Sequence, residues 1–459
     1  MSQGRVIVVG GGLAGIAASL ECARSGAAVT LLESRGRLGG AAYSFVRDGI
    51  TADNGQHVFL RCCTAYRQLL AEIEAEDCVT LQPRLDIPVL APGGRGRLRR
   101  SGLPAPLHLA ASLVRYPFLS LRERLGVARA MQALRRVDPD DPAADGRSFG
   151  EWLAEHGQGQ AAIDSIWDLI ARPTLNLVPA DASLAQAAQV FQVGLLQGRT
   201  ASDVGYARVP LGEIHDQAAG RALARTGVEV NLRQGATGVV PGPDGFRVEL
   251  GGAPALTAPA VILAVPPDRL ARIIPEAAGV PADALAALGS SPIVNLHIVF
   301  DRRVTELPFA AGVRTPVQWF FDRTASSGLS QGQYLAVSLS AAQDELSLTA
   351  EELRARYVDA LGELLPQARG ARVQTFFVTR EHAATFRAAP GARALRPAAR
   401  TGLSGLALAG AFTDTGWPAT MEGAVRSGLA AAHEVLGHLS TSGGSARAQA
   451  APELVGSGR

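Results

Sequence analysis

The segment "RVIVVGGGLAGIAASLECARSGAAVTLLE", residues 5–33, decides the fold. Its apolar run at 5–9 predicts a buried parallel strand, its Ala/Leu-rich run at 13–25 predicts a helix, and 28–32 predicts a second strand. Strand, helix and strand in this order form one βαβ unit. The segment therefore indicates a doubly wound α/β domain with a parallel sheet.

Glycines punctuate the turn between the first strand and the helix. Gly10 permits the tight turn, Gly12 lets a pyrophosphate approach the backbone, and Gly15 lets the helix pack on the sheet. The phosphates would lie at the positive N-terminus of that helix. Glu33 ends the second strand, where an acidic residue can bind a ribose 2′-hydroxyl. Together these residues predict a dinucleotide site.

The composition narrows the remaining function classes. A chain of 459 residues that is 47% hydrophobic can bury a large core and predicts two domains. All 44 basic residues are arginine, which excludes mechanisms that need a Schiff-base or phosphate-loop lysine. The net charge of +2 gives no global field that would favour nucleic acid as a partner.

Cysteine and histidine usage points to a metal-free protein of the cytoplasm. The four cysteines show no C-x-x-C spacing, and the histidines show no metal-ligand spacing, so we expect no metal site. The folded motif begins by residue 6, which leaves no room for a signal peptide, and no uncharged apolar run is long enough to span a bilayer.

Later segments return to the strand pattern of the first domain. Strand-like runs fall within roughly 227–267 and at 405–412, so we expect a discontinuous cofactor domain with an α+β substrate domain inserted into it. The predicted ranges are, for the cofactor domain, 1–80, 205–270 and 395–438; for the substrate domain, 81–204 and 271–394; and, for a flexible tail, 439–459.

The residues that follow Glu33 indicate which dinucleotide binds. The run "ESRGRLGGAAYSF", residues 33–45, resembles the second FAD signature of the amine oxidase and phytoene desaturase superfamily. The resemblance implies a Rossmann-like, GR2-type FAD-binding fold. Family members often carry arginine directly after the Gly39-Gly40 pair, where this chain has Ala41, so Arg35 or Arg37 would supply the charge.

Four further runs narrow the resemblance to one branch of that superfamily. "DNGQHVF" (53–59), "AVILAVPP" (260–267), "REHAATFRAAPG" (380–391) and "GWPATMEGAVRSG" (416–428) resemble the squalene-associated, FAD-dependent hydroxysqualene dehydroxylases. This resemblance implies reduction of hydroxysqualene to squalene on the bacterial hopanoid route with reduced FAD.

The glycine motif and the resemblance together predict the cofactor contacts. The C-terminal strand should rejoin the sheet, and the N-terminus of the helix that follows it should face the flavin. Many relatives bind the ribityl chain with an acidic residue at the position of Ala411. In this chain either backbone amides or Asp414 would make that contact. The predicted FAD-binding residues are Gly10, Gly12, Gly15, Glu33, Ser34, Arg35, Gly39, Gly40, Gly55, Gln56, Ala236, Gly410, Ala411, Asp414, Thr420, Met421 and Ala424.

Replacing an allylic hydroxyl by hydrogen requires a hydride donor and a proton donor. His57 can donate a proton near neutral pH, and Asp53 could do so if burial raised its pKa. Both residues also have a purely structural interpretation as a cofactor contact and a turn cap. Glu381 and Glu422 are weaker candidates, and Glu422 is expected to cap its own helix or face its dipole.

Two other functions stay open. An FAD-dependent desaturase of polyprenes would run the opposite redox direction on a similar apolar substrate, and a non-catalytic flavin-binding scaffold of an isoprenoid complex would need no substrate. Amine oxidation is disfavoured because the chain has no lysine to place near the flavin. No second G-x-G-x-x-G follows in a strand–turn–helix context, so we expect an external electron donor.

A basic, amphipathic segment indicates contact with a membrane surface. Residues 95–136 contain ten arginines and one acid, Glu123. An apolar stripe, interrupted at Pro117, follows helical spacing, and Arg115, Arg122, Arg129 and Arg136 recur every seventh residue; the stripe comprises Leu107, Ala111, Val114, Phe118, Leu121 and Leu125. A solvated helix would explain the pattern equally well. A long isoprenoid substrate favours peripheral binding to the inner face of the cell membrane.

A second helical segment, 164–196, is apolar at the spacing of one helix face. We expect it either to line the substrate tunnel or to pack in the core; the residues concerned are Trp167, Leu169, Ile170, Phe191 and Leu195.

Overall fold

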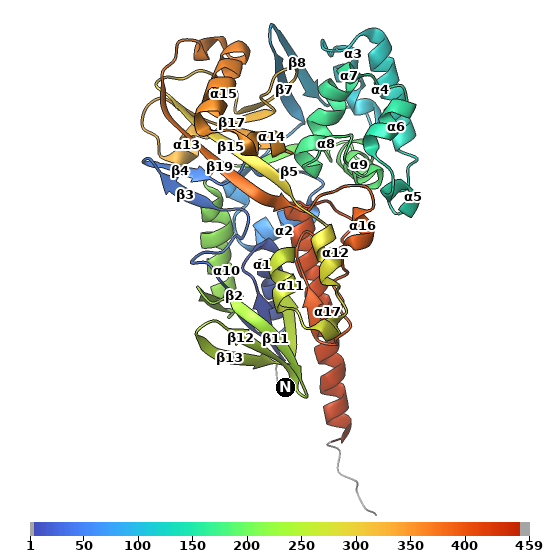
Figure 1. Ribbon diagram of the computed structural model, residues 1–459, viewed down its shortest axis with the longest axis vertical. Helices are drawn as coiled ribbons and strands as arrows, with labels where there is room; N and C mark the ends of the chain where they lie inside the picture. Colours follow the sequence, from blue (N-terminus) through green and yellow to red (C-terminus); the bar gives the residue numbers. More distant parts are fainter. Residues whose placement is uncertain (1–3, 450–459) are drawn as a thin grey trace, which may run out of the picture.

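A five-stranded parallel sheet forms the lower half of the molecule in the computed structural model, which describes residues 4–449 (Figure 1). Its central strands are buried along nearly their whole length, because helices or other strands cover both faces. This sheet confirms the predicted Rossmann-like α/β fold. The strand order is β10 (Glu229–Leu232), β2 (Ala28–Glu33), β1 (Arg5–Val9), β14 (Ala260–Leu263) and β20 (Leu406–Leu408).

Two helices pack closely beside this sheet. Helix α1 (Leu13–Arg24) follows β1, and helix α17 (Met421–Gln449) follows β20 and lies against α1. Gly428 marks the crossing, because a Cβ atom there would lie 2.1 Å from the carbonyl oxygen of Ala14. The first and last segments of the chain are therefore held together by a backbone-to-backbone contact.

The predicted flexible tail requires a correction at its start. Helix α17 continues through Gln449, so residues 439–449 are helical, and 450–459 lie outside the described residues. Each residue added to an existing helix gains a hydrogen bond without a new nucleation cost, and the chain has no proline between Pro418 and Pro452.

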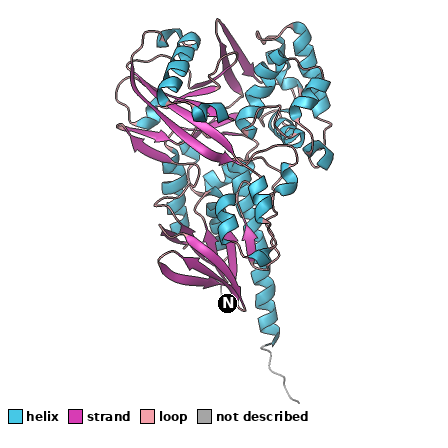
Figure 2. Cartoon of the chain, in the orientation of Figure 1, coloured by secondary structure: helices cyan, strands magenta, loops and turns pink. Residues whose placement is uncertain are grey.

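A seven-stranded sheet lies above the parallel sheet in the view of Figures 1 and 2. Its longest strands, β15 and β19, pair antiparallel and descend towards the parallel sheet. The order is β19 (Val373–Thr385), β15 (Ser291–Phe300), β18 (Gln333–Ser340), β17 (Trp319–Asp322), β16 (Phe309–Gly312), β7 (Asp86–Ala91) and β8 (Gly94–Arg99).

A group of helices flanks this upper sheet on the right of Figure 1. Their apolar faces meet around Trp167, Phe149 and Phe191, whose rings contact one another. The main helices of this group are α3 (Ala110–Val114), α4 (Leu121–Leu134), α6 (Phe149–Glu155), α8 (Asp168–Leu175) and α9 (Leu184–Phe191).

Smaller elements complete the fold. Two helices, α2 (Thr64–Glu72) and α10 (Ala219–Arg225), belong to the lower half, and α15 (Ala350–Leu364) packs on the upper sheet. The remaining sheets are β3 (Ser44–Arg47) with β4 (Ile50–Asp53); β5 (Val58–Leu60), β9 (Val204–Ala207) and β6 (Val79–Leu81); and β11 (Ala236–Gly242), β12 (Gly245–Leu250) and β13 (Ala253–Ala258).

The strands of the parallel sheet come from 5–33, 229–263 and 406–408, inside the ranges predicted for the cofactor domain. The upper sheet takes its strands from 86–99 and 291–385, inside the ranges predicted for the substrate domain. The domain boundaries themselves stay a prediction.

The segment 95–136 is not the near-continuous helix that its seven-residue repeat suggests. Helices α3 and α4 are separated at Arg115–Ser120, so Arg122 and Arg129 share α4 while Arg115 does not. Phe118 of the predicted stripe is buried against Tyr116, because the chain turns inward around Pro117.

Replacing Gly428 with alanine tests the contact between α1 and α17. We expect the free energy of unfolding to fall by about 1–3 kcal/mol, because the new methyl group meets backbone that cannot move away as a side chain could. Chemical denaturation measures the change. The matched control is Gly437→Ala in the same helix, where a Cβ atom meets nothing within 4 Å and alanine should stabilise the helix by about 0.5–1 kcal/mol. Equal effects of the two substitutions would contradict this packing.

Candidate active site

The turn between β1 and α1 is built from glycines because neighbouring backbone fills the space of their side chains. A Cβ atom on Gly10 would lie 2.3 Å from the carbonyl oxygen of Ala264, and one on Gly15 would lie 1.8 Å from that of Gly10. Gly10 also has φ +111°, a conformation that other residues rarely adopt. This turn therefore brings β1, α1 and β14 as close together as their backbones allow.

Helix α1 begins with its amide groups uncapped. Its N-cap is Gly12, which supplies no side-chain hydrogen bond, and its first turn carries no acid. Gly40 faces this end of the helix: a Cβ atom on it would lie 2.8 Å from the Cα of Gly12. An uncapped, positive helix end between two glycine segments is suited to phosphate oxygens.

Glu33 ends β2 beside this turn and is buried. Its Oε2 accepts from the amide of Gly11 at 2.7 Å, and its Oε1 accepts from the amide of Arg35 at 2.7 Å. The Ser34 hydroxyl donates to the same Oε1 at 3.2 Å. The carboxylate thus fixes the glycine turn in addition to its predicted contact with a ribose.

A cavity of about 1620 Å³ opens from the glycine turn. It lies beside fifteen of the seventeen predicted FAD-binding residues; the exceptions are Gly15, which packs α1 on the sheet, and Asp414. Its volume exceeds the roughly 300–1,000 Å³ of an ordinary small-molecule site. The cavity can therefore hold a second ligand beside a dinucleotide.

The loop after β20 approaches the cavity with backbone rather than with an acid. Gly410 and Ala411 line the cavity, whereas the carboxylate of Asp414 pairs with Arg393 at 3.4 Å and accepts from the amide of Gly416. Of the two alternatives for the ribityl contact, the geometry favours backbone amides, because Asp414 is turned towards Arg393.

Arg396 holds this loop and was not found by sequence reasoning. Its buried guanidinium donates to the carbonyl oxygens of Thr413 at 2.5 Å, Trp417 at 2.8 Å and Phe412 at 3.2 Å. Burial lowers the pKa of Arg396 to about 10, so the group stays charged at neutral pH. Arg396 lies between Arg393 and Arg400 in a Pro/Ala-rich segment that carries no motif from which this role could be predicted.

The sequence suggested that Glu422 caps its own helix or faces the dipole of that helix. Glu422 does lie in the first turn of α17, but its hydrogen bonds go to a neighbouring helix. Its buried carboxylate accepts from the amides of Ala65 at 3.1 Å and Tyr66 at 2.8 Å, which belong to the first turn of α2. Arg426 pairs with it at 2.7 Å. The carboxylate therefore caps a neighbouring helix, since α17 places its first turn directly against the start of α2.

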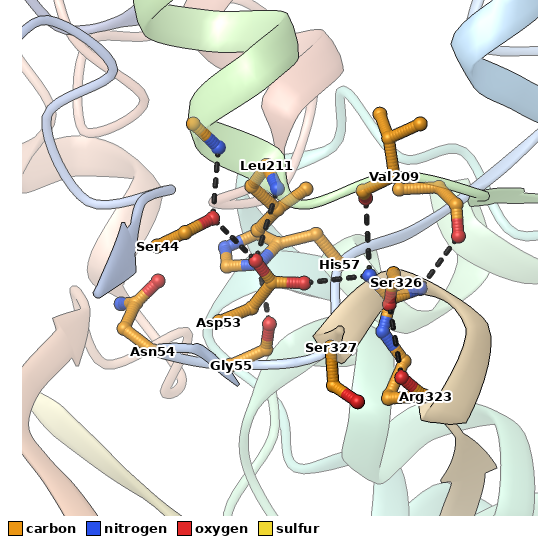
Figure 3. Close-up of polar contacts among 12 residues, drawn as sticks. Ser44, Asp53, Asn54, Gly55, His57, Val209, Leu211, Arg323, Ser326 and Ser327 are labelled. Atoms are coloured by element: carbon orange, nitrogen blue, oxygen red, sulfur yellow. Dashed lines mark hydrogen bonds and ion pairs between the residues drawn. The ribbon is translucent and has the colours of Figure 1, made fainter. Parts of the chain in front are cut away.

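The carboxylate of Asp53 is held by several hydrogen bonds and an ion pair (Figure 3). Its carboxylate pairs with Arg323 at 2.8 Å and accepts from the Ser44 hydroxyl at 2.6 Å and the Leu211 amide at 2.9 Å. Both Asp53 and Arg323 are almost completely buried. Asp53 does not line the large cavity, and its position does not support the predicted role of proton donor.

His57 lines the cavity, as a proton donor would. Its Nδ1 lies 3.1 Å from the carbonyl oxygen of Gly55, an arrangement in which Nδ1–H donates and Nε2 is left as an acceptor. Burial lowers the pKa of His57, although the Gly55 carbonyl and the charges of Asp53 and Glu381 oppose the shift. The ring is therefore mainly neutral at pH 7, a poor state for donating a proton.

Glu381, which also lines the cavity, contacts two residues that lie far from it in the sequence. The Oε1 atom of Glu381 accepts from the Asn54 side-chain amide at 3.0 Å and from the Tyr43 hydroxyl at 3.3 Å. Tyr43 stacks beneath the guanidinium of Arg37 at 3.7 Å, and burial, followed by the charge of Glu381, raises the pKa of its hydroxyl. Sequence reasoning ranked Glu381 low because nothing local links it to Tyr43 and Asn54.

The rest of the cavity is an apolar chamber beneath the upper sheet and its helices. Leu169, Ile170 and Leu195 line it, as one predicted alternative stated, whereas Trp167 and Phe191 pack in the core. The chamber also includes Ile87, Leu113, Met131, Phe309 and Trp319.

The fold and this cavity define a dinucleotide-dependent protein with an attached apolar chamber. The family model of flavin containing amine oxidoreductases matches residues 13–436, so the chain belongs to this family. It is an FAD-dependent oxidoreductase, and the glycine turn, the uncapped α1 and the loop at Gly410 fit that cofactor.

Individual relatives agree with this assignment. The chain is 30% identical to hydroxysqualene dehydroxylase of Rhodopseudomonas palustris over 94% of this chain and 98% of that protein. It is 26% identical to zeta-carotene desaturase of Zea mays over 92% and 82%, respectively. Its fold matches cyclohexylamine oxidase of Brevibacterium oxydans with a TM-score of 0.70, 20% identity, and coverage of 95% and 100%.

Replacing Asp53 with asparagine separates a structural from a catalytic role. We expect the free energy of unfolding to fall by about 3–5 kcal/mol, because the substitution leaves the Arg323 guanidinium buried without a countercharge. Thermal and chemical denaturation measure the loss. The control is Asp181→Asn, which breaks a partly exposed pair with Arg387 and should cost at most about 1 kcal/mol. A stable Asp53→Asn protein that binds FAD but has lost activity would restore Asp53 as the acid.

Proposed function

We propose that this protein reduces hydroxysqualene to squalene with reduced FAD, a step of squalene biosynthesis. The observation that carries the proposal is the single cavity in which a nucleotide cradle continues into an apolar chamber. The similarity to hydroxysqualene dehydroxylase, which extends over nearly the whole of both chains, supports the same reaction.

The chamber suits a long hydrocarbon chain. Its walls bury apolar substrate surface at a gain of roughly 25 cal/mol per Å², and they exclude water from the reacting carbon. FAD, when bound and reduced, supplies a hydride. The protein must then orient the allylic alcohol, keep the site dry and deliver one proton so that the hydroxyl leaves as water. The electrons would reach the cofactor from an external donor.

A polyprene desaturase is the competing function. The similarity to zeta-carotene desaturase over 92% of this chain favours it, and an apolar chamber would accept either substrate. The two functions differ in redox direction, because a desaturase removes hydrogen from a hydrocarbon and passes electrons to an acceptor. A polar group beside the cofactor segments, such as Glu381, is needed for an alcohol substrate and has no evident use for a hydrocarbon.

Anaerobic product analysis tests the proposal. The FAD-loaded protein, with dithionite-reduced cofactor and hydroxysqualene in detergent, should form squalene in amounts equal to the reduced FAD supplied. A parallel reaction with oxidised FAD, an added quinone and phytoene should form no new conjugated absorbance. Desaturation without dehydroxylation would contradict the proposal and favour the competitor. Inertness towards both substrates would favour a flavin-binding scaffold.

We also propose that the protein takes its substrate from a membrane surface. None of the described helices combines the length and the apolar character needed to cross a bilayer. Five of the nine large apolar side chains that the described residues leave exposed fall within 103–125, with Val114 and Leu121 at 64% and 69% exposure. Leu107 is 56% exposed and also lines the cavity, so the chamber reaches the surface at this patch.

Positive charge surrounds the same patch. Arg115, Arg122 and Arg129 are exposed, and none of them forms an ion pair with any residue in the described part of the chain. Each basic residue near an anionic bilayer contributes about 1 kcal/mol to binding. An apolar opening surrounded by unpaired arginines is the arrangement that a peripheral membrane protein requires.

Liposome sedimentation at low salt tests the membrane contact. Vesicles with anionic lipid should bind the protein, and Leu121→Ser with Leu125→Ser should weaken binding at least tenfold, because two exposed apolar anchors are lost. The control is Val46→Ser, which replaces an exposed apolar residue of β3; this strand lies on the opposite side of Figure 1 from α3 and α4. Failure of the wild-type protein to bind, or an equal effect of the control, would contradict this surface.

A further inference from the structure

We propose that Glu381 is the catalytic acid of this site and donates the proton with which the substrate hydroxyl leaves. The inference rests on the proposed reduction of an allylic isoprenoid alcohol and names the group that this reaction needs.

Three carboxyl groups line the cavity within the described residues: Glu33, Asp268 and Glu381. Glu33 is bound by backbone amides at the glycine turn, where the nucleotide is expected. Asp268 is 73% exposed on α11 (Pro267–Ile273) and faces solvent beside Arg272. Glu381 is therefore the one carboxyl group of the wall that is available to a substrate.

The hydrogen bonds of Glu381 leave one oxygen unused. Oε1 accepts from Tyr43 and Asn54, whereas Oε2 has no hydrogen-bond partner, and no cation pairs with the carboxyl group among the residues that the structure describes. Oε2 is thus the oxygen of Glu381 that can meet a substrate hydroxyl. The Tyr43 and Asn54 contacts then fix the acid in place while Oε2 carries the proton.

The contacts also place Glu381 at the boundary between the cradle and the chamber. Glu381 belongs to β19 of the upper sheet, while Tyr43 follows the Gly39-Gly40 pair and Asn54 precedes Gly55. Both partners thus stand directly beside the segments predicted to hold FAD. A proton donor for the carbon that receives the hydride has to lie at this boundary.

The alternative donor, His57, is less suited to the step. Its Nδ1 faces the Gly55 carbonyl, and burial lowers its pKa, so it carries no excess proton near pH 7. His57 and Glu381 interact electrostatically, and the negative form of Glu381 would favour protonated His57.

The step balances without a further reactant. The C–O bond of the allylic alcohol breaks with its electron pair, and the leaving oxygen takes the proton from Glu381 Oε2 to form water. FAD, when bound and reduced, would supply the hydride for the new C–H bond at that carbon. The substrate is reduced by two electrons, the cofactor is oxidised by two, and Glu381 regains its proton from solvent through the wall.

The substitution Glu381→Gln tests the inference with little change in shape. Its carbonyl oxygen can still accept from Tyr43 and Asn54, but its amide cannot donate a proton as an acid does. We expect FAD content and melting temperature to stay at the wild-type level while kcat falls by about 100-fold or more, the usual effect of losing a general acid. In Glu381→Ala, added formic acid should restore turnover in proportion to its concentration, which a structural role would not allow.

Glu345→Gln is the matched control, because Glu345 accepts from the Tyr357 hydroxyl at 2.9 Å outside the cavity wall. Its turnover should equal that of the wild type. Near-normal turnover by Glu381→Gln would overturn the inference, and so would a slow variant that formic acid does not rescue. If the wild-type protein itself forms no squalene, the proposed reaction fails, and the inference fails with it.

Discussion

The structure depends on the absence of side chains where α1 meets its neighbours. Gly15 lets α1 touch the end of β1, Gly10 lets β1 touch the loop after β14, and Gly428 lets α17 touch α1. At each contact a single methyl group would strike backbone. These contacts join the first, middle and last segments of the chain, so the N-terminus of α1 is held at the edge of the sheet where a dinucleotide binds.

Contacts between distant segments also explain how one cavity can hold two ligands. Strands β15 and β19 of the upper sheet extend to the glycine loops, and the Glu381 contacts with Tyr43 and Asn54 fasten the two parts at this point. The buried ion pair of Asp53 with Arg323 makes a second connection, between the end of β4 and the segment after β17 of the upper sheet. Polar groups thus concentrate at the boundary, while the chamber beyond it stays apolar and leads to the surface at Leu107.

Local patterns were enough to predict the parallel sheet and most of the cofactor cradle. Gly10, Gly12 and Glu33 could be assigned because a strand–glycine–helix unit fixes both their conformation and their neighbours. The resemblance to the amine oxidase and phytoene desaturase superfamily made it possible to assign residues in the later segments. Fifteen of the predicted FAD-binding residues line the cavity. The choice between Asp414 and backbone amides for the ribityl contact could not be made from the sequence, because the pairing of Asp414 with Arg393 depends on how the loop turns.

The polar contacts of Glu381 and Glu422 could not be predicted, because they join residues that are far apart in the sequence. Glu381 meets Tyr43 only after the chain has crossed both sheets, and Glu422 caps a helix that lies far away in sequence. The sequence could not show that burial lowers the pKa of His57, because burial is a property of the folded state. The regular spacing of arginines in 95–136 suggested one helix face, but the turn at Pro117 divides it.

The central claim is that cofactor and isoprenoid share one continuous cavity. Titrating the oxidised, FAD-loaded protein with squalene in detergent, while recording the visible absorption bands of the flavin, tests it most directly. We expect a saturable shift of these bands at one squalene per FAD, because the hydrocarbon chain would displace water beside the flavin ring. Binding of squalene without any change in the flavin spectrum would contradict the shared cavity.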